Sequence, residues 1–240
     1  MNSLPKCSPL DIKIENFVLF QSNYKERLIV LFVFIVFVSV YVAYPELDLL
    51  VSKSFFSPEH GFIFNNPNMN FLSKTIMWLG RIILFVVLLV AVKNFLQNGF
   101  NQSKQTCVAL LILIVGNLVL VPSIKNYWDR GRPVYTTNFG GDVLFSSPLK
   151  PINKASNNHS FVSGHAAGGY SLMIFAAFTS HRKRWLRRGI LTGFSIGIFR
   201  VMQGSHYLSD ILFAFFPIWF AMEIVILLHI HFSNPQVIIK

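Results

Sequence analysis

Six runs of apolar residues, separated by polar connections, dominate the pattern along the chain. A helix needs about 20 apolar residues to cross a bilayer, and most of the runs approach that length. The pattern therefore predicts six transmembrane helices, at roughly 28–44, 75–95, 106–122, 163–180, 189–205 and 208–231. The first and third runs are short for a full crossing, so tilt, local thinning or extension into polar flanks is expected there.

These helices predict an all-α fold, in which residues 28–231 form one six-helix membrane domain. Residues 1–27 are expected to form a cytoplasmic or interfacial N-terminal segment, and residues 232–240 a cytoplasmic tail. Two long connections remain, at about 45–74 and 123–162. The second is rich in Gly, Pro, Ser and Asn, so an irregular lid is expected there.

Composition supports a membrane protein. Of the 240 residues, 53% are hydrophobic, 25 are Phe and only 13% are charged, which is too apolar for an ordinary soluble domain. The net charge of +11 raises the question of nucleic acid, but the basic residues lie between apolar runs rather than in one patch. No nucleic-acid partner is predicted. Cys7 and Cys107 lack metal-ligand spacing and are assigned no chemistry.

The distribution of Lys and Arg predicts the orientation, because cytoplasmic loops carry the positive excess. The basic run 181–188 is the strongest anchor. With the N-terminus inside, the cytoplasmic segments hold twelve basic residues: Lys6, Lys13, Lys25, Arg27, Lys93, Lys104, Arg182, Lys183, Arg184, Arg187, Arg188 and Lys240. The outside loops hold seven: Lys53, Lys74, Lys125, Arg130, Arg132, Lys150 and Lys154. Both termini are therefore predicted to be cytoplasmic.

Three polar clusters lie where apolar runs meet the outside surface. The first contains Lys125, Asp129, Arg132 and Pro133. Residues seven apart on a helix differ by about 20° in direction, so Lys125 and Arg132 are expected on one helix face with Asp129 between them. Two converging cations suit a phosphate monoester. An interfacial basic patch that touches lipid headgroups is an equal alternative.

The second cluster is Ser163, Gly164 and His165, directly before the fourth apolar run. Ser is a good N-cap, and the first N–H groups of a helix bind anions such as phosphate oxygens. His165 would then lie beside that anion site, where an imidazole can protonate a departing alkoxide. Taken alone, the tripeptide fits a simple cap with an interfacial His better than it fits a catalytic role.

The third cluster contains Arg200, His206 and Asp210. His206 and Asp210 are four residues apart, so on a helix the carboxylate would accept the N–H of one ring nitrogen and leave the other free to attack. Ionisable residues at membrane depth are expensive and usually functional. The alternative is that Asp210 pairs with Arg200 as a structural contact.

Together, the clusters resemble the type 2 phosphatidic acid phosphatase superfamily, whose pattern runs Lys-x6-Arg-Pro, then Pro-Ser-Gly-His, then Ser-Arg-x5-His-x3-Asp. The matching residues occur here in the same order, and the resemblance covers roughly 75–231. Val162 replaces the usual Pro and Phe199 the usual Ser, and neither change removes a catalytic group. The segment 160–165 is also similar to the middle motif of bacterial lipid A phosphatases within this superfamily.

The resemblance implies a mechanism. His206 attacks phosphorus and forms a phosphohistidine, Asp210 orients its imidazole, and His165 protonates the leaving alkoxide. Three cations and helix-terminus donors can stabilise phosphoryl transfer without a metal, so neither a metal nor another cofactor is expected. The residues implied to hold the phosphate oxygens are Lys125, Arg132, Ser163, Gly164 and Arg200.

The expected function is hydrolysis of a phosphate monoester on a phospholipid or glycolipid, with lipid A 1-phosphate as the first choice and the 4′-phosphate next. A phosphatase for undecaprenyl pyrophosphate or phosphatidylglycerophosphate would use the same catalytic residues. A non-hydrolytic transporter of anionic lipid or phosphate would use only the same cations. The expected location is the bacterial inner membrane with a periplasmic active site. The sequence predicts neither the oligomeric state nor the fold of loops 45–74 and 133–162.

Overall fold

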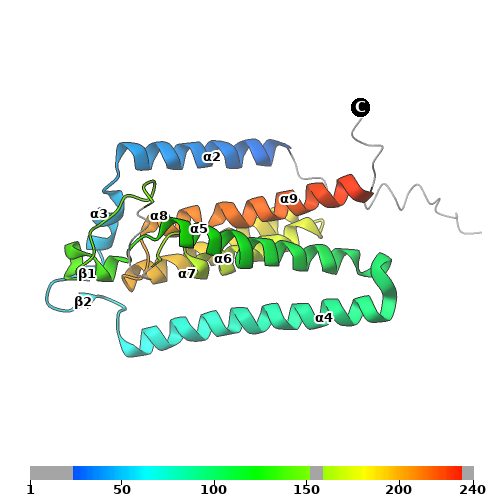
Figure 1. Ribbon diagram of the computed structural model, residues 1–240, viewed down its shortest axis with the longest axis horizontal. Coiled ribbons are helices and arrows are strands. Elements are labelled where there is room, and N and C mark those ends of the chain that lie inside the picture. The colour runs from blue at the N-terminus through cyan, green and yellow to red at the C-terminus, as the bar shows by residue number, and fades with distance from the viewer. Residues whose placement is uncertain (1–23, 152–158, 234–240) are drawn as a thin grey trace, which may run out of the picture.

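The computed structural model describes residues 24–151 and 159–233, which are largely helical (Figure 1). The first half comprises α2 (Tyr24–Ala43), α3 (Leu47–Lys53), β1 (Phe56–Ser57), β2 (Gly61–Phe62) and α4 (Pro67–Leu113). It is followed by the π-helix η1 (Ile114–Leu120), α5 (Val121–Trp128) and the 3-10 turns η2 (Pro133–Tyr135) and η3 (Thr137–Phe139). The last part comprises α6 (Gly164–Tyr170), the 3-10 helix η4 (Ser171–Ala177), α7 (Arg182–Met202), α8 (Leu208–Phe213) and α9 (Phe215–Ser233). The all-α prediction is confirmed.

Four helical segments in the described part of the chain are long and apolar enough to cross a membrane: 24–43, 67–99, 106–135 and 208–228. They correspond to the first, second, third and sixth predicted spans. The fourth and fifth predicted spans are helical as α6–η4 and α7, but neither is among those four, so the number of six spans stays a prediction. The second span begins at Pro67 rather than 75, because Asn66 caps the helix and proline suits its first position.

Parts of the predicted terminal segments lie outside the described residues. These are residues 1–23 and 234–240, whose expected cytoplasmic or interfacial places stay predictions. Residues 24–27 belong to α2 rather than to the N-terminal segment, because the helix begins at Tyr24. Likewise, α9 continues to Ser233, into the segment that was expected to be a tail.

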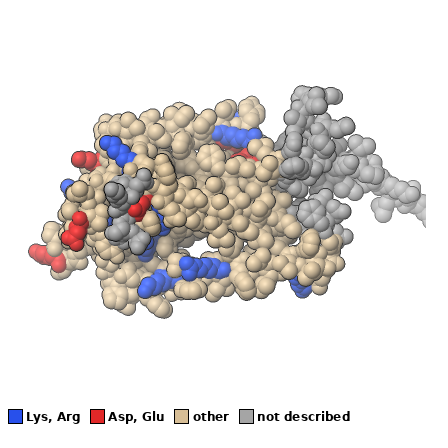
Figure 2. Space-filling view, viewed as in Figure 1, with Lys and Arg blue, Asp and Glu red and all other residues tan. Residues whose placement is uncertain are grey.

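α4 contains a reversal at Gly99, whose left-handed backbone (φ 70) interrupts the helix. Figure 1 shows the first half of α4 along the edge of the molecule and the chain returning beside the other helices. Only 6% of the apolar window in 67–99 is buried, and Figure 2 shows a hollow between this helix and the bundle. The same face carries few charged side chains along its middle, as expected of a surface that contacts lipid.

The closest helix contacts join α6 and η4 to α7. Gly189, Gly193 and Gly197 recur every four residues along α7 and are buried. A Cβ atom at Gly193 would lie 2.2 Å from Cδ1 of Tyr170, and one at Gly189 would lie 2.4 Å from Cγ of Met173. Small residues at this spacing let two helix backbones approach closely. Gly189 and Gly193 therefore hold α7 against α6 and η4, while Gly197 packs against Ile211 of α8.

Gly193→Ala is expected to destabilise the bundle, because the added methyl group overlaps the Tyr170 ring and overpacking costs about 1–3 kcal/mol. Thermal unfolding in detergent, followed by the fraction of monodisperse protein, measures the effect. Gly168→Ala is the matched control, since a Cβ atom there meets nothing within 4 Å and alanine favours a helix. Equal unfolding temperatures for the two variants would contradict the close packing.

An ion-pair cluster joins three helices at the end of the bundle where α7 begins. Glu26 in α2 accepts a hydrogen bond from Nε of Arg182 (2.7 Å). Glu223 in α9 accepts one from Nε of Arg27 (2.9 Å), and its second oxygen lies 3.4 Å from Nη2 of Arg182. The first helix is thereby tied to α7 and α9.

At the opposite end, the two long connections pack on each other. The antiparallel pair β1 and β2 brings Phe56 and Phe62 together, and both rings contact Phe139 from the second connection, with centroids 5.1 Å apart in each case. Leu49 and Tyr207 complete this apolar cluster. The described part of the second connection contains the end of α5, the short turns η2 and η3 and an isolated bridge between Thr136 and Val143, and its role as a lid stays a prediction.

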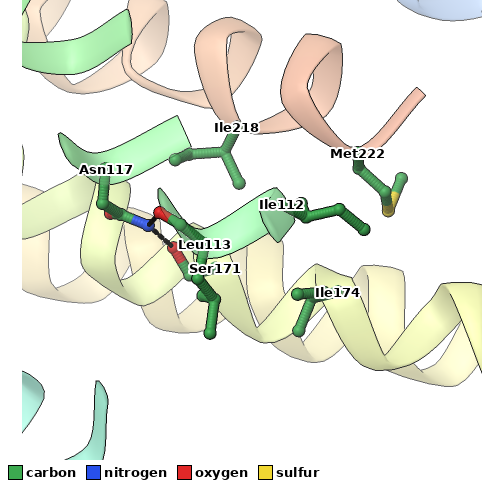
Figure 3. A pocket seen from close by; sticks show the side chains of 7 residues that line it. All are labelled: Ile112, Leu113, Asn117, Ser171, Ile174, Ile218 and Met222. Carbon is green, nitrogen blue, oxygen red and sulfur yellow. Dashed lines mark hydrogen bonds between the residues drawn. The ribbon is translucent and has the colours of Figure 1, made fainter. Parts of the chain in front are cut away.

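Asn117 links the π-helix η1 to η4 (Figure 3). Its Nδ2 donates to the carbonyl of Leu113 (3.3 Å) and to Oγ of Ser171 (2.8 Å), which in turn donates to the carbonyl of Ala167 (2.9 Å). Hydrogen bonds between apolar helices fix their relative register. The surrounding apolar pocket has no space for a water molecule and is lined further by Ile112, Ile174, Ile218 and Met222.

Candidate active site

Backbone hydrogen bonds bring the three polar clusters together at the end of the bundle that carries α3 and α8. One bond joins each pair of clusters. They run from Ser160 N to Arg130 O (2.8 Å), from Ser163 N to Asp210 O (2.9 Å) and from Val134 N to Gly204 O (2.9 Å). Segments that are far apart in the sequence thus form one site.

Lys125 and Arg132 do not lie on one helix, so that prediction is wrong. Asp129 adopts a left-handed conformation (φ 42, ψ 43) and ends α5. Arg132 follows in extended backbone (φ −79, ψ 150), because a residue directly before proline disfavours the helical conformation. The two cations still come together, since the charge of Lys125 interacts with those of Arg132 and Arg200.

Two of the cations carry buried donors. The Nε atoms of Arg132 and Arg200 have no hydrogen-bond partner among the residues that the structure describes. Arg200 is only 8% exposed, and its Nη1 donates to Oε1 of Gln203 (2.5 Å). Leaving a buried donor unpaired costs free energy, and a phosphate oxygen would satisfy both Nε groups.

Ser163 caps α6, as the sequence predicts. Its side chain accepts a hydrogen bond from the backbone N–H of Ala166 (3.3 Å). Gly164 opens the helix and is exposed, so its N–H lies in the first turn, where backbone donors favour anions. The cap thus presents these N–H groups next to His165.

His206 precedes a helix rather than lying on one, so the predicted helical pairing with Asp210 is also wrong. α8 begins at Leu208, and Oδ2 of Asp210 accepts a hydrogen bond from the backbone N–H of Tyr207 (2.8 Å) as part of the helix cap. The same oxygen lies 3.4 Å from Nδ1 of His206, an ion-pair distance without the alignment of a hydrogen bond. The cap therefore places the carboxylate beside the ring and leaves Nε2 on its other side.

His206 is held neutral by its surroundings. The side chain is buried, and burial, followed by the positive charges of Lys125, Arg200 and Arg132, holds the pKa of His206 well below its usual value. The neutral imidazole keeps a lone pair on one nitrogen at neutral pH. Such a group can attack an electrophile, whereas an imidazolium cannot.

His165 lies across from His206. Their ring centroids are 6.5 Å apart, so an atom between them can lie about 3 Å from both rings. His165 is half-buried, lies against the backbone of Ser73 in α4, and interacts with the charges of Lys125 and Arg200. The arrangement suits attack by one imidazole and proton transfer by the other on opposite sides of a phosphate.

Four polar residues behind the site were not predicted as site residues. They are Asp48, Ser73, Arg130 and Gln203. Arg130 contacts Asp48, and Gln203 accepts hydrogen bonds from both Arg200 and Ser73. Arg130 lies inside the first cluster, but its place in the sequence marked it only as one more basic residue of an outside loop. Gln203 is three residues after Arg200 and so had a sequence signal. Asp48 and Ser73 had none, being 82 and 130 positions from their partners.

All eight residues proposed from the sequence fall in one region that matches a known family. The sequence model of the PAP2 superfamily matches residues 105–232, more than half of the chain. The chain belongs to the PAP2 superfamily. Three proteins named "Lipid A 4'-phosphatase" are similar to it. That of Francisella tularensis subsp. novicida is 27% identical over 181 residues, covering 72% of this chain and 82% of that protein.

The other two relatives come from Rhizobium. The protein of Rhizobium leguminosarum is 30% identical over 193 residues, covering 72% of this chain and 83% of its own. That of Rhizobium etli is also 30% identical over 193 residues, covering 72% of this chain and 75% of its own. No solved structure matches the chain. The PAP2 resemblance in the three motifs is confirmed, and with it the assignment of the chain to membrane phosphatases.

Proposed function

We propose that this PAP2 protein removes the 4′-phosphate of lipid A through a phosphohistidine on His206. The proposal rests on one arrangement: His206 and His165 face each other next to Lys125, Arg132 and Arg200. Five polar side chains thus come together at the end of an apolar bundle. A site that only bound and released an anion would need the cations but not the two imidazoles.

The proposed reaction has two steps. Nε2 of His206 attacks phosphorus, the bond from phosphorus to the sugar oxygen breaks, and His165 gives its proton to the departing oxygen. Water then attacks the phosphohistidine, His165 takes up a proton from that water, and phosphate leaves as the phosphorus–nitrogen bond breaks. Lys125, Arg132 and Arg200 stabilise the charge on the phosphoryl oxygens in both steps, together with Ser163 and the N–H of Gly164. No step requires a metal.

The choice of the 4′-position follows the three relatives, all of which are named for it. The sequence motifs alone favoured the 1-position and placed the 4′-position second. Both phosphates are monoesters on the same disaccharide, so the catalytic residues serve either one. The names of the relatives therefore support placing the 4′-position before the 1-position in this proposal.

The proposed orientation has the site in the periplasm and both termini in the cytoplasm of a bacterial inner-membrane protein. α7 begins within the basic run 181–188 and ends next to the site, and its 21 residues span about 30 Å. Cytoplasmic loops carry the positive excess, so the basic run favours the cytoplasmic side. The site at the other end of α7 would then face the periplasm.

Phosphate release from lipid A tests the proposal. Purified protein in detergent, with a chelator present, is expected to convert bisphosphorylated lipid A to the product that lacks the 4′-phosphate, as identified by fragment masses. Undecaprenyl pyrophosphate and phosphatidylglycerophosphate serve as competing substrates. Loss of the 1-phosphate would overturn the position, and preference for a competitor would overturn the substrate. Binding of lipid without any release, by folded protein, would favour a transporter.

A further inference from the structure

Arg130 is a fully buried charged residue at the site. Its side chain is 0% exposed, and its guanidinium lies 4.1 Å from the centroid of the Tyr207 ring. Nη1 donates to Oδ1 of Asp210 (2.7 Å), and Nη2 donates to Oδ2 of Asp48 (2.8 Å). Nε donates to the carbonyl of Ser146 (2.9 Å). One guanidinium thus joins the carboxylate beside His206 to a second carboxylate in α3.

Asp48 is equally buried and accepts several hydrogen bonds. Its side chain is 0% exposed. Oδ1 accepts from the backbone N–H of Ser209 (2.9 Å) and from the hydroxyl of Tyr41 (3.2 Å), and Oδ2 also accepts from the hydroxyl of Ser209. Acceptance of this many donors matches an ionised carboxylate. Asp48 lies outside the matched region 105–232, so a residue beyond the family match reaches the catalytic end.

The charges of this cluster change during the proposed reaction. With His206 neutral, two carboxylates and one guanidinium leave a net charge of −1. When the ring gains a phosphoryl group it also gains positive charge, and the cluster becomes neutral. Without Asp48, Arg130 would neutralise Asp210 alone, and the same step would leave a buried net positive charge. Charges interact strongly where water is excluded, so a buried net positive charge in the absence of Asp48 would oppose phosphorylation of His206.

We propose that Asp48 is a positioning residue of the phosphatase reaction, which shares Arg130 with Asp210 so that Asp210 keeps its negative charge toward His206. The proposal rests on the proposed phosphohistidine mechanism and adds a residue to it. Asp48 touches neither the substrate nor the reacting atoms. It acts through Arg130, which it contacts directly, and through Ser209, which precedes Asp210 in α8.

Asp48→Asn is expected to lower kcat about 10- to 100-fold and to change KM less than about twofold, because substrate contacts remain. The double variant Asp48→Asn with Asp210→Asn is expected to be no slower than Asp210→Asn alone, since Asp48 acts only through the Asp210 carboxylate, which is already absent. Glu223→Gln is the matched control. It removes the charge of another mostly buried carboxylate that pairs with arginine, at the far end of the bundle, and is expected to leave kcat unchanged.

A second measurement separates catalysis from folding. Phosphoramidate transfers its phosphoryl group to an imidazole with release of ammonia, and intact mass reports the rate at which folded protein takes up the label on His206. We expect labelling of Asp48→Asn to be about tenfold slower than that of wild type. If wild type is active and Asp48→Asn matches it in both assays, or if the double variant shows multiplied losses, the inference is wrong. If wild type neither hydrolyses nor takes up label, the proposed function fails and the inference fails with it.

Discussion

Replacement of His206 by alanine is expected to abolish phosphate release, with a loss of at least about ten-thousandfold. Loss of a covalent nucleophile removes the first step entirely, and no other imidazole in the described structure lies beside Asp210. Phosphate release from lipid A in detergent measures the loss. Trapping of a phosphoenzyme by rapid acid-free denaturation is expected to succeed with wild type and to fail with the variant.

The control for this variant addresses folding, since His206 is 1% exposed and its removal leaves a space. His60→Ala changes a histidine in the β1–β2 connection whose side chain is 86% exposed, and it is expected to retain full activity. Unfolding temperatures of the two variants show whether His206→Ala is still folded. A folded His206→Ala protein with wild-type turnover would exclude the phosphohistidine mechanism.

Replacement of His165 by asparagine is expected to reduce hydrolysis of lipid A about 10²- to 10⁴-fold, because the sugar oxygen then leaves without a proton. A substrate with a good leaving group, such as p-nitrophenyl phosphate, does not need that proton. We expect the variant to release one equivalent of p-nitrophenol rapidly and then to slow, because the second step also uses His165 to take a proton from water. Stopped-flow absorbance measures this burst.

The two histidines are distinguished by this comparison. His206→Ala is expected to lose the burst as well as steady turnover, whereas His165→Asn keeps the burst and accumulates phosphohistidine. If His165→Asn lost activity equally on lipid A and on p-nitrophenyl phosphate, the assignment of His165 as the acid would be wrong, and a role in binding alone would fit better. Because the two ring centroids are 6.5 Å apart, neither imidazole occupies a position from which it could replace the other.

The sequence predicted the helices and the residues of the site better than the local geometry that joins them. Long apolar runs depend only on composition, so the four apolar helical segments at 24–43, 67–99, 106–135 and 208–228 overlap the predicted spans. The prediction that Lys125 and Arg132 share one helix face is wrong because Asp129 takes a left-handed conformation, which residue spacing does not reveal. The prediction that His206 and Asp210 pair on one helix is wrong for a similar reason, since Tyr207 is the N-cap and α8 begins after His206.

Arg130 shows a different limit. As a basic residue in a loop, it contributed only to the count that sets orientation, and nothing in its neighbours marks it as buried. Its partners Asp48 and Asp210 are 82 and 80 residues away, in opposite directions along the chain. Only the folded arrangement of α3 and α8 shows that this charge is internal. Contacts at such separations have no local sequence signature.

The three backbone links between the clusters also set an order in time. Ser163 N is bound to Asp210 O, so the site cannot close before the ribosome has made α8. Asp48 in α3 and Arg130 in the loop after α5 are synthesised earlier, before the carboxylate of Asp210 that completes their cluster. A nascent or truncated chain that ends before α8 therefore carries Lys125, Arg132, Arg200 and His206 but lacks the Asp210 carboxylate that lies beside the His206 ring.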